Sequence, residues 1–260
     1  MSLFVGTSGW DYEEWKGGFY PPDVPQSRFL PYYASVLSAC EVNATFYRLQ
    51  SESAVARWRQ STPDGFRFAV KAHRRLTHGR QLMADDRTQA FRRSFLESLA
   101  PLGPRLSCIL FQFPPNRERD DAALERVLNG LSSSVPAAIE FRHESWDSHD
   151  VRERIAEMGG TTCIADFSGP APDRLPPGPI AYVRLRADTY SDNDRAAWLS
   201  LLSREAEKRD VYAFAKHEGA PAGDPHVGVG LATWLVQQIE GGPGVAAPDQ
   251  AVGANPGTCS

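Results

Sequence analysis

The sequence predicts an α/β fold in which eight parallel strands and the helices between them close into one barrel of the (β/α)8, TIM-barrel-like type. Two observations indicate this class. Short, continuous apolar runs alternate with longer amphipathic stretches over residues 1–240, which is typical of parallel strands covered by helices. Eight such units in about 240 residues also match the usual size of this barrel, about 250 residues.

The predicted strands are apolar runs at residues 3–6, 39–43, 66–70, 106–113, 137–141, 161–166, 180–186 and 211–216. Most are continuous rather than alternating, which favours strands that are buried on both faces. An open doubly wound sheet is the alternative arrangement. However, Gly6-Thr-Ser-Gly9 lacks the third glycine of a dinucleotide-binding motif and continues into aromatic residues rather than a helix. We therefore favour the barrel.

Seven segments between or after the strands carry apolar residues at helical spacing: 27–38, 52–60, 86–99, 120–131, 148–158, 193–208 and 231–239. Ser27 and Ser51 are candidate N-caps of the first two. Residues 169–179 contain five prolines, which predicts an irregular crossover between the sixth and seventh strands. We expect residues 1–240 to form one domain and residues 241–260, which show no periodicity, to form a disordered tail.

Composition argues against some partners and compartments. The net charge is −4 and the isoelectric point is about 5.9, so bulk attraction to nucleic acid or acidic membranes is not expected, although a local basic pocket is compatible with these values. The amino terminus resembles no signal peptide, and no apolar run reaches membrane-spanning length. The four cysteines form no CxxC pair. We expect a cytoplasmic protein without a membrane partner, and the oligomeric state stays open.

In a barrel of this type the active site lies at the carboxyl ends of the strands. Polar or charged side chains stand at the end of each predicted strand: Thr7 and Ser8; Glu41 and Asn43; Lys71 and His73; Gln112; Glu140, Arg142 and His143; Asp166; Arg184 and Arg186; Lys216 and His217. Burying an unpaired charge is costly. The presence of so many ionisable groups at the carboxyl ends of the strands therefore predicts a functional site there, at what we call the mouth of the barrel.

Seven segments carry a resemblance to a known family: Gly6-Thr-Ser-Gly-Trp10 with Tyr12, Trp15 and Phe19-Tyr-Pro21; Glu41-Val-Asn-Ala-Thr-Phe-Tyr47; Trp58 with Thr62-Pro-Asp-Gly-Phe66; Phe68-Ala-Val-Lys71; Thr77-His78; Leu110-Phe-Gln-Phe-Pro114; and Glu140-Phe-Arg-His-Glu-Ser-Trp146. On these segments, which span roughly residues 4–186, the chain resembles the DUF72, or YecE-like, family. The resemblance implies a TIM-barrel-like fold and no settled biochemical activity.

The carboxyl-terminal third departs from the pattern of that family. Tyr182-Val-Arg-Leu-Arg-Ala187 stands where the family pattern implies Tyr-x-Arg-x-His-Gly, and Lys216-His-Glu-Gly219 stands where it implies an Asn-rich ending with Asp. Arg186 and Lys216 make the predicted mouth more basic.

We predict that Glu41, Glu140 and His143 are catalytic groups. The predicted substrate-binding residues are Thr7, Ser8, Trp10, Asn43, Lys71, His73, Arg142, Arg184, Arg186 and Lys216. No cofactor or resident metal is predicted. Glu41, Glu140, His143, Asp166 and His217 offer ligands to a divalent metal, but HxH, HExxH and CxxC spacings are absent from the sequence.

Several candidates also have a structural alternative. Glu41 and Asn43 are compatible with a buried pair that bridges to Arg or Lys, and Glu140 with a salt bridge to Arg142. Arg184 is compatible with an interior ion pair to Glu140 or Asp166. The aromatic residues of the first loop, Trp10 included, equally suit the packing of a lid. His73 lies in the basic run 71–75, which equally suits a solvated loop edge.

Three functions fit these residues. The first, which we favour, is an enzyme, for example a hydrolase, that holds a phosphate-bearing or otherwise anionic small molecule or nucleic-acid fragment on the basic mouth and uses a carboxylate as general base. The second is a glycosidase-like enzyme that uses two glutamates. The third is a non-catalytic module that binds nucleic acid or phosphate and stacks bases on its aromatic residues.

Overall fold

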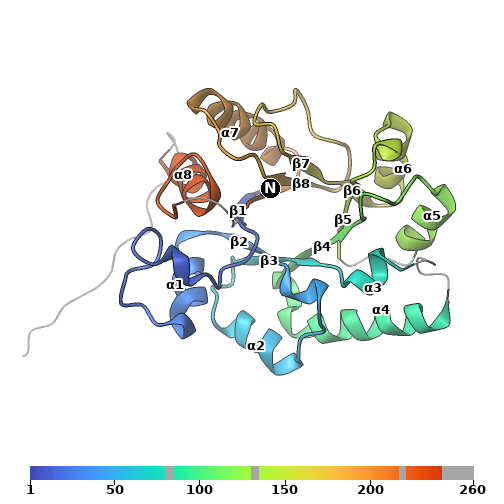
Figure 1. Cartoon of the computed structure of the whole chain (residues 1–260), viewed down its shortest axis with the longest axis horizontal. Coiled ribbons are helices and arrows are strands. Elements are labelled where there is room, and N and C mark those ends of the chain that lie inside the picture. Colours follow the sequence, from blue (N-terminus) through green and yellow to red (C-terminus); the bar gives the residue numbers. More distant parts are fainter. Residues whose placement is uncertain (80–84, 130–134, 217–220, 242–260) are drawn as a thin grey trace, which may run out of the picture.

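Nine parallel strands form the centre of the protein. The computed structural model describes residues 1–79, 85–129, 135–216 and 221–241. The strands are β1 Leu3–Thr7, β2 Ala39–Val42, β3 Arg67–Lys71, β4 Leu106–Gln112, β5 Ala137–Glu140, β6 Gly160–Thr162, β7 Ile164–Asp166, β8 Ile180–Leu185 and β9 Asp210–Ala215. They pair in the order β6-β5-β4-β3-β2-β1-β9-β8-β7. The sheet curves into a nearly closed barrel (Figure 1), which confirms the predicted fold class.

The predicted sixth strand, residues 161–166, is divided at Cys163. Its first part, β6, pairs with β5 through Thr162 and Ile139, and its second part, β7, pairs with β8 through Ile164 and Val183. β6 and β7 are thus the two edge strands of the sheet, and because they follow each other directly in the chain they bring its two edges together. The expectation of eight uninterrupted strands was wrong at this point, because residues 161–166 turn from one partner to the other.

Helices surround the barrel (Figure 1). They are α1 Phe29–Val36, α2 Glu52–Gln60, α3 Arg74–Thr77, α4 Asp86–Leu99, α5 Asp121–Asn129, α6 His149–Glu157, α7 Asp192–Ala206 and α8 Gly228–Glu240. Each of the seven predicted helical segments overlaps one of these helices, and the short α3 was not predicted. No helix in the described part of the chain combines the length and apolar composition needed to span a bilayer.

The helix ends follow the sequence signals in part. Ser51 caps α2 as predicted, because its hydroxyl accepts a hydrogen bond from the Ala54 amide. Ser27 does not cap α1. It lies inside a 3-10 turn, Gln26–Arg28, and α1 begins after it at Phe29. The proline-rich crossover between β7 and β8 contains no helix, as predicted. The predicted tail, apart from Gly241, lies outside the described residues.

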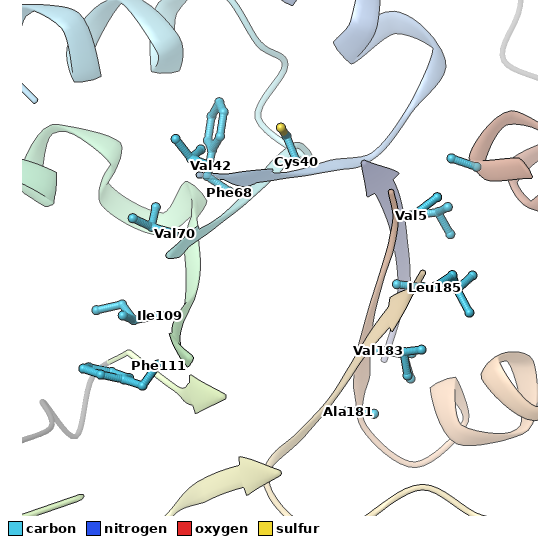
Figure 2. Packing of buried hydrophobic residues seen from close by; sticks show 14 of the residues in the cluster. Val5, Cys40, Val42, Phe68, Val70, Ile109, Phe111, Ala181, Val183 and Leu185 are labelled. Carbon is cyan, nitrogen blue, oxygen red and sulfur yellow. The ribbon is translucent and has the colours of Figure 1, made fainter. Parts of the chain in front are cut away.

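Successive strand residues point alternately into the barrel and out toward the helices. Outward side chains such as Val5, Val70 and Val183 belong to one large apolar cluster, and Figure 2 shows them pointing away from the barrel centre. A second cluster includes the inward side chains Ala39, Ala69, Cys108, Leu110, Ala138, Cys163, Ile180, Tyr182, Tyr212 and Phe214. Two residues further along five of the strands, the next inward positions hold Glu41, Lys71, Gln112, Glu140 and Arg184. The barrel interior therefore changes from apolar to charged toward the carboxyl ends of its strands.

Gly6 lets β1 approach β2 closely. A Cβ atom at Gly6 would lie 1.8 Å from the carbonyl oxygen of Ala39, its partner in the β1–β2 register. We expect Gly6→Ala to lower the free energy of unfolding by about 2 kcal/mol or more, because backbone must shift to admit the methyl group. Gly65→Ala is the matched control, since a Cβ there meets nothing within 4 Å. Equal denaturant midpoints for the two variants would contradict this expectation.

Candidate functional site

A buried arginine joins two buried glutamates at the carboxyl end of the barrel. Arg184 donates one hydrogen bond of 2.9 Å from Nη2 to Oε1 of Glu41 and another of 2.6 Å from Nη1 to Oε2 of Glu140. The side chains of Arg184, Glu41 and Glu140 are 3%, 0% and 1% exposed. Their strands, β8, β2 and β5, are far apart in the sequence, so this contact depends on closure of the barrel. Arg184 therefore has the interior ion pair that the sequence offered as its structural alternative, here with both glutamates.

Neutral hydrogen-bond donors complete the shell around Glu41. The Ser8 hydroxyl donates to Oε1 at 2.9 Å, and the Tyr182 hydroxyl donates to Oε2 at 2.8 Å. Ser8 directly follows β1, and Tyr182 is the inward residue two positions before Arg184 on β8. Both carboxylate oxygens of Glu41 thus have partners supplied by rigid strands or by their immediate continuation.

Glu140 is held from its other side by an amide and a second arginine. Gln112 donates from Nε2 to Oε1 of Glu140 at 2.8 Å, and Arg142 donates from Nε to the same oxygen at 3.1 Å. The Arg142 side chain is 39% exposed. One end of the buried network therefore continues through Arg142 to the surface of the mouth.

The environment keeps both glutamates ionised. Burial raises the pKa of Glu41, but the charge of Arg184 and the hydrogen bonds from Tyr182, Arg184 and Ser8 outweigh it, so the net pKa lies below the usual value. The pKa of Glu140 is also lowered, because Arg184, Gln112 and Arg142 together outweigh the effect of burial. Neither carboxyl group is therefore protonated near neutral pH.

Lys71 extends the network across the mouth. It is the last residue of β3, and its ammonium group donates to Oε1 of Gln112 at 2.8 Å, so that Gln112 links Lys71 to Glu140. The ammonium also lies 4.2 Å from the centre of the Phe46 ring. Burial, followed by the nearby charge of Arg184, lowers the pKa of Lys71 to about 8. Lys71 therefore has an appreciable neutral fraction near physiological pH.

Three further basic residues lie at the ends of neighbouring elements. Arg186 reaches Oγ of Ser8 at 3.4 Å. Lys216 follows β9 and pairs with Asp188 at 2.8 Å. The His78 ring lies 5.1 Å from the Phe46 ring, and its pKa is lowered by burial and then by the charges of Lys71, Arg117 and Arg142. In the sequence, His78 was singled out only through the family resemblance. It lies after β3 in the chain, and its ring contacts Phe46, the ring that Lys71 also contacts.

Three predicted site residues make contacts away from this network. The Thr7 hydroxyl lies 2.9 Å from the Tyr33 hydroxyl of α1, on the helix side of the barrel wall. Trp10 packs edge-on against Trp58 of α2 and Phe68 of β3. These contacts favour the packing alternative for the first loop. His73 caps α3, because its Nδ1 accepts from the Arg75 amide, and its ring contacts Phe91 of α4.

Three other candidates lie near the mouth with different surroundings. His143 begins a 3-10 turn, Glu144–Trp146, where its Nδ1 accepts from the Ser145 amide at 3.2 Å. Asn43 follows β2, and its Oδ1 is buried with no hydrogen-bond partner among the described residues. Asp166 ends β7 and holds the following loop, since its carboxylate accepts from the Gly169 amide and the Tyr190 hydroxyl. Asp166 is therefore built into the local fold.

A pocket of about 610 Å³ opens beside Glu140. It is lined by Glu140, Arg142, His143, Arg152, Thr162, Cys163 and Phe167 together with Pro115, Phe141, Glu144, Trp146, Asp147, Ile164 and Ala165. It thus lies where β5 meets the divided sixth strand. Two arginines and a histidine contribute to its wall. The predicted residues Arg142 and His143 are therefore brought to one cavity.

A metal site finds no support in the local geometry of the described residues. Within residues 1–79, 85–129, 135–216 and 221–241, no group of three or more His, Cys, Asp and Glu side chains is placed to hold a metal ion. His217, which the sequence offered as a ligand, lies outside these ranges. The oxygens of Glu41 and Glu140 already accept hydrogen bonds from the network described above.

Sequence reasoning did not select Gln112, Tyr182 or His78 as site residues. The signal for Tyr182 was present, because it lies two positions before Arg184 and therefore faces the same way on β8. Gln112 stands at the end of β4, in line with the other strand ends. The roles of Gln112 and Tyr182 are recognised only from the hydrogen bonds that they donate to Glu140 and Glu41.

Comparisons with known proteins agree with this architecture. The protein is similar to the UPF0759 protein YunF of Bacillus subtilis (strain 168), with 31% identity over 151 residues that cover 56% of this chain and 52% of YunF. It is also similar to the UPF0759 protein YecE of Escherichia coli (strain K12), with 27% identity over 159 residues that cover 60% of this chain and 54% of YecE. The chain spans about half the length of the curated relatives it matches.

A similar fold occurs in a solved structure, and a family pattern covers most of the sequence. A DUF72 family protein from Thermotoga maritima MSB8 aligns with a TM-score of 0.73 and 24% identity, over 92% of this chain and 100% of that one. The pattern of the family described as "Protein of unknown function DUF72" matches residues 4–239. The protein therefore belongs to the DUF72 family.

Proposed function

We propose that the protein is an enzyme that binds a phosphate-bearing or otherwise anionic substrate at the carboxyl-terminal mouth of the barrel. The observation that carries this proposal is the connected network of three cations, Lys71, Arg142 and Arg184, around two carboxylates, Glu41 and Glu140. Because Arg184 is committed to both carboxylates, Arg142 and Lys71 bring the positive charge toward the solvent side.

Two bases at the mouth lie close to other cations. The pKa of Lys71 is lowered by burial and then by Arg184, even though Glu41 and Glu140 act in the opposite direction. The pKa of His78 is lowered by burial and then by Lys71. Burial is the largest cause of both shifts, and the neighbouring cations that act beside it also attract anions where water is partly excluded. The adjoining pocket, whose wall holds Arg142 and Arg152 together with Glu140, Glu144 and Asp147, offers space for the rest of a small substrate.

Two observations favour this function over a glycosidase-like reaction. Such enzymes need one of their two carboxyl groups to be protonated at working pH. Here the pKa values of Glu41 and Glu140 are both lowered, because Arg184 stabilises both charged forms. The two glutamates thus organise the cations and are poor proton donors. Lys71, with a pKa of about 8, is better suited than either glutamate to accept a proton near neutral pH.

A non-catalytic binding module is the second candidate, and exposed aromatic residues favour it. Tyr47, after β2, is 70% exposed, and Phe167, after β7, is 63% exposed. Both stand on loops that follow carboxyl strand ends, where stacking on a nucleobase is sterically accessible. A module of this kind would bind single-stranded oligonucleotides with a steep salt dependence and without turnover.

The Arg142→Gln variant tests the enzyme proposal. We expect it to weaken the binding of inorganic phosphate and of phosphorylated sugars at least tenfold, about 1.4 kcal/mol, because one charged donor at the rim is lost. Isothermal titration calorimetry at fixed salt measures the dissociation constants. Arg126→Gln on α5 is the matched control and keeps wild-type affinity. Turnover of phosphorylated compounds is measured by product analysis.

Equal affinities of Arg142→Gln and the wild type would contradict the assignment of Arg142 and the anion site with it. Oligonucleotide binding that depends on Tyr47 and Phe167, combined with no turnover of any phosphorylated compound, would favour the binding module instead.

A further inference from the structure

We propose that Lys71 is the reacting group of this site, and that its amine adds to the carbonyl carbon of an aldehyde or ketone to form an imine. The anionic group expected on that carbonyl compound rests on the proposed function, whereas the amine chemistry rests on the surroundings of Lys71 alone.

The position of Lys71 suits a nucleophile. It ends β3 and faces the barrel interior, because it lies two residues after Ala69, which belongs to the interior cluster. Its Nζ is fixed by the hydrogen bond to Gln112 at 2.8 Å and by the Phe46 ring at 4.2 Å. Gln112 in turn is fixed by Glu140. The flexible lysine side chain is therefore held with its amine in the mouth, at the strand ends where barrel enzymes carry out their chemistry.

The surroundings of Lys71 differ from those of the other lysines. Lys16 lies 3.9 Å from Glu13, Lys208 lies 3.1 Å from Glu205, and Lys216 lies 2.8 Å from Asp188. Each of these carboxylates stabilises a charged ammonium. The hydrogen bond of Lys71 goes instead to a neutral amide. Burial, followed by the charges of Arg184 and Arg142, lowers its pKa by more than Glu41 and Glu140 raise it. With a pKa of about 8, about a tenth of Lys71 is neutral at pH 7, compared with roughly 0.04% of an ordinary lysine.

Composition adds to this contrast. Lysine accounts for four of the 28 Lys and Arg residues, at positions 16, 71, 208 and 216. Arginine serves equally well or better for anion binding and ion pairs, but its guanidinium stays charged and is not a nucleophile at neutral pH. In a chain with so strong a preference for arginine, a lysine on a neutral partner inside the barrel indicates amine chemistry.

The proposed step balances with groups that are present. The lone pair of neutral Lys71 forms a C–N bond, and the carbonyl π electrons move to oxygen. A proton passes from nitrogen to that oxygen and gives a carbinolamine. A second proton, taken up by the hydroxyl, lets water leave and produces a protonated imine. We assign the transfer of these protons to His78, whose ring contacts the same Phe46 ring as Lys71. The protonated imine carries the same positive charge as the ammonium form of Lys71, so the net charge of the network around Glu140 does not change.

Reductive trapping tests this step with the full chain. The protein is incubated at pH 7 with pyridoxal 5′-phosphate and sodium cyanoborohydride, and the reduced adducts are located by peptide mass spectrometry. We expect Lys71 to be labelled at least tenfold faster than Lys16 and Lys208, with a rate that rises through a midpoint near pH 8. Lys71→Arg abolishes the fast adduct and keeps the positive charge, while Lys208→Arg leaves it unchanged. Thermal melts confirm that both variants fold.

The arms of the experiment separate this inference from the proposed function. Pyridoxal, which lacks the phosphate, is compared with pyridoxal 5′-phosphate. Fast labelling of Lys71 by both aldehydes at equal rates supports the amine chemistry and contradicts the anion site. Binding of inorganic phosphate to the protein, without any preferential labelling of Lys71, supports the anion site and overturns the amine chemistry. Labelling of the four lysines at similar rates overturns it as well.

Discussion

Replacement of Arg184 by methionine lowers the free energy of unfolding by about 3–5 kcal/mol, because the substitution leaves two buried carboxylates without their shared cation. Glu41 and Glu140 are 0% and 1% exposed, so water cannot replace the guanidinium. Urea denaturation at pH 7 measures the loss. Arg184→Lys is expected to lose less, since it keeps the charge but cannot reach both glutamates with two separate nitrogens.

An exposed arginine provides the control for this prediction. Arg152 pairs with Asp147 at the surface, where the two side chains are 37% and 73% exposed. Arg152→Met is expected to change stability by at most about 1 kcal/mol, because surface ion pairs contribute little. Adding Glu41→Gln and Glu140→Gln to Arg184→Met is expected to restore part of the loss, since the unpaired charges are then removed. A loss below 1 kcal/mol in Arg184→Met would contradict the central role of this residue.

Acidification is expected to destabilise the protein below about pH 4.5, and less steeply in Glu41→Gln than in the wild type. Burial raises the pKa of Glu41, but the charge of Arg184 and the hydrogen bonds from Tyr182, Arg184 and Ser8 lower it by more than burial raises it. The folded-state pKa therefore lies below the usual 4.5. A carboxylate with a lowered pKa contributes stability that is fully present above the unfolded pKa and is lost as pH falls toward the folded one. Each such group adds up to about 1.4 kcal/mol per pH unit to the slope in that range.

Denaturant titrations between pH 6 and pH 3 measure this slope. Glu140 has a lowered pKa for the same reason, because Arg184, Gln112 and Arg142 outweigh the effect of its burial. Glu140→Gln is therefore expected to reduce the slope as Glu41→Gln does, and the double variant to reduce it further. Above pH 5 the slopes of all four proteins should agree, although the variants are less stable. Unchanged slopes below pH 4.5 would show that these two carboxylates are not responsible for the acid sensitivity.

The strands and their facing were predictable because they depend on local pattern. Continuous apolar runs marked each strand, and the period of two along a strand placed Glu140 with Arg142 and Arg184 with Arg186. The division of the sixth strand at Cys163 was not predictable. It depends on how residues on each side pair with β5 and β8, which is a property of the closed sheet.

The cluster of charged side chains was predictable in its position and less so in its contacts. Glu41, Lys71, Glu140, Arg142 and Arg184 were selected by their place at strand ends, and the structure joins them in one network. Thr7 and His73 were selected by the same rule, and Trp10 as an aromatic residue of the first loop. Their side chains contact α1, α4 and α2 instead. Thr7 ends β1 and shares the outward facing of Val5. Trp10 and His73 lie beyond the ends of their strands, where alternation no longer fixes the direction of a side chain.

The sequence by itself determined the barrel class, the order of its strands and helices, and the end of the barrel that carries the charged side chains, because periodicity and strand boundaries are local properties. Only the tertiary structure decided that Arg184 belongs to both Glu41 and Glu140, and that Lys71 contacts a neutral amide. Those partners come from strands separated by up to 143 positions in the chain, and their distances, their burial and the resulting pKa of Lys71 exist only once the barrel has closed.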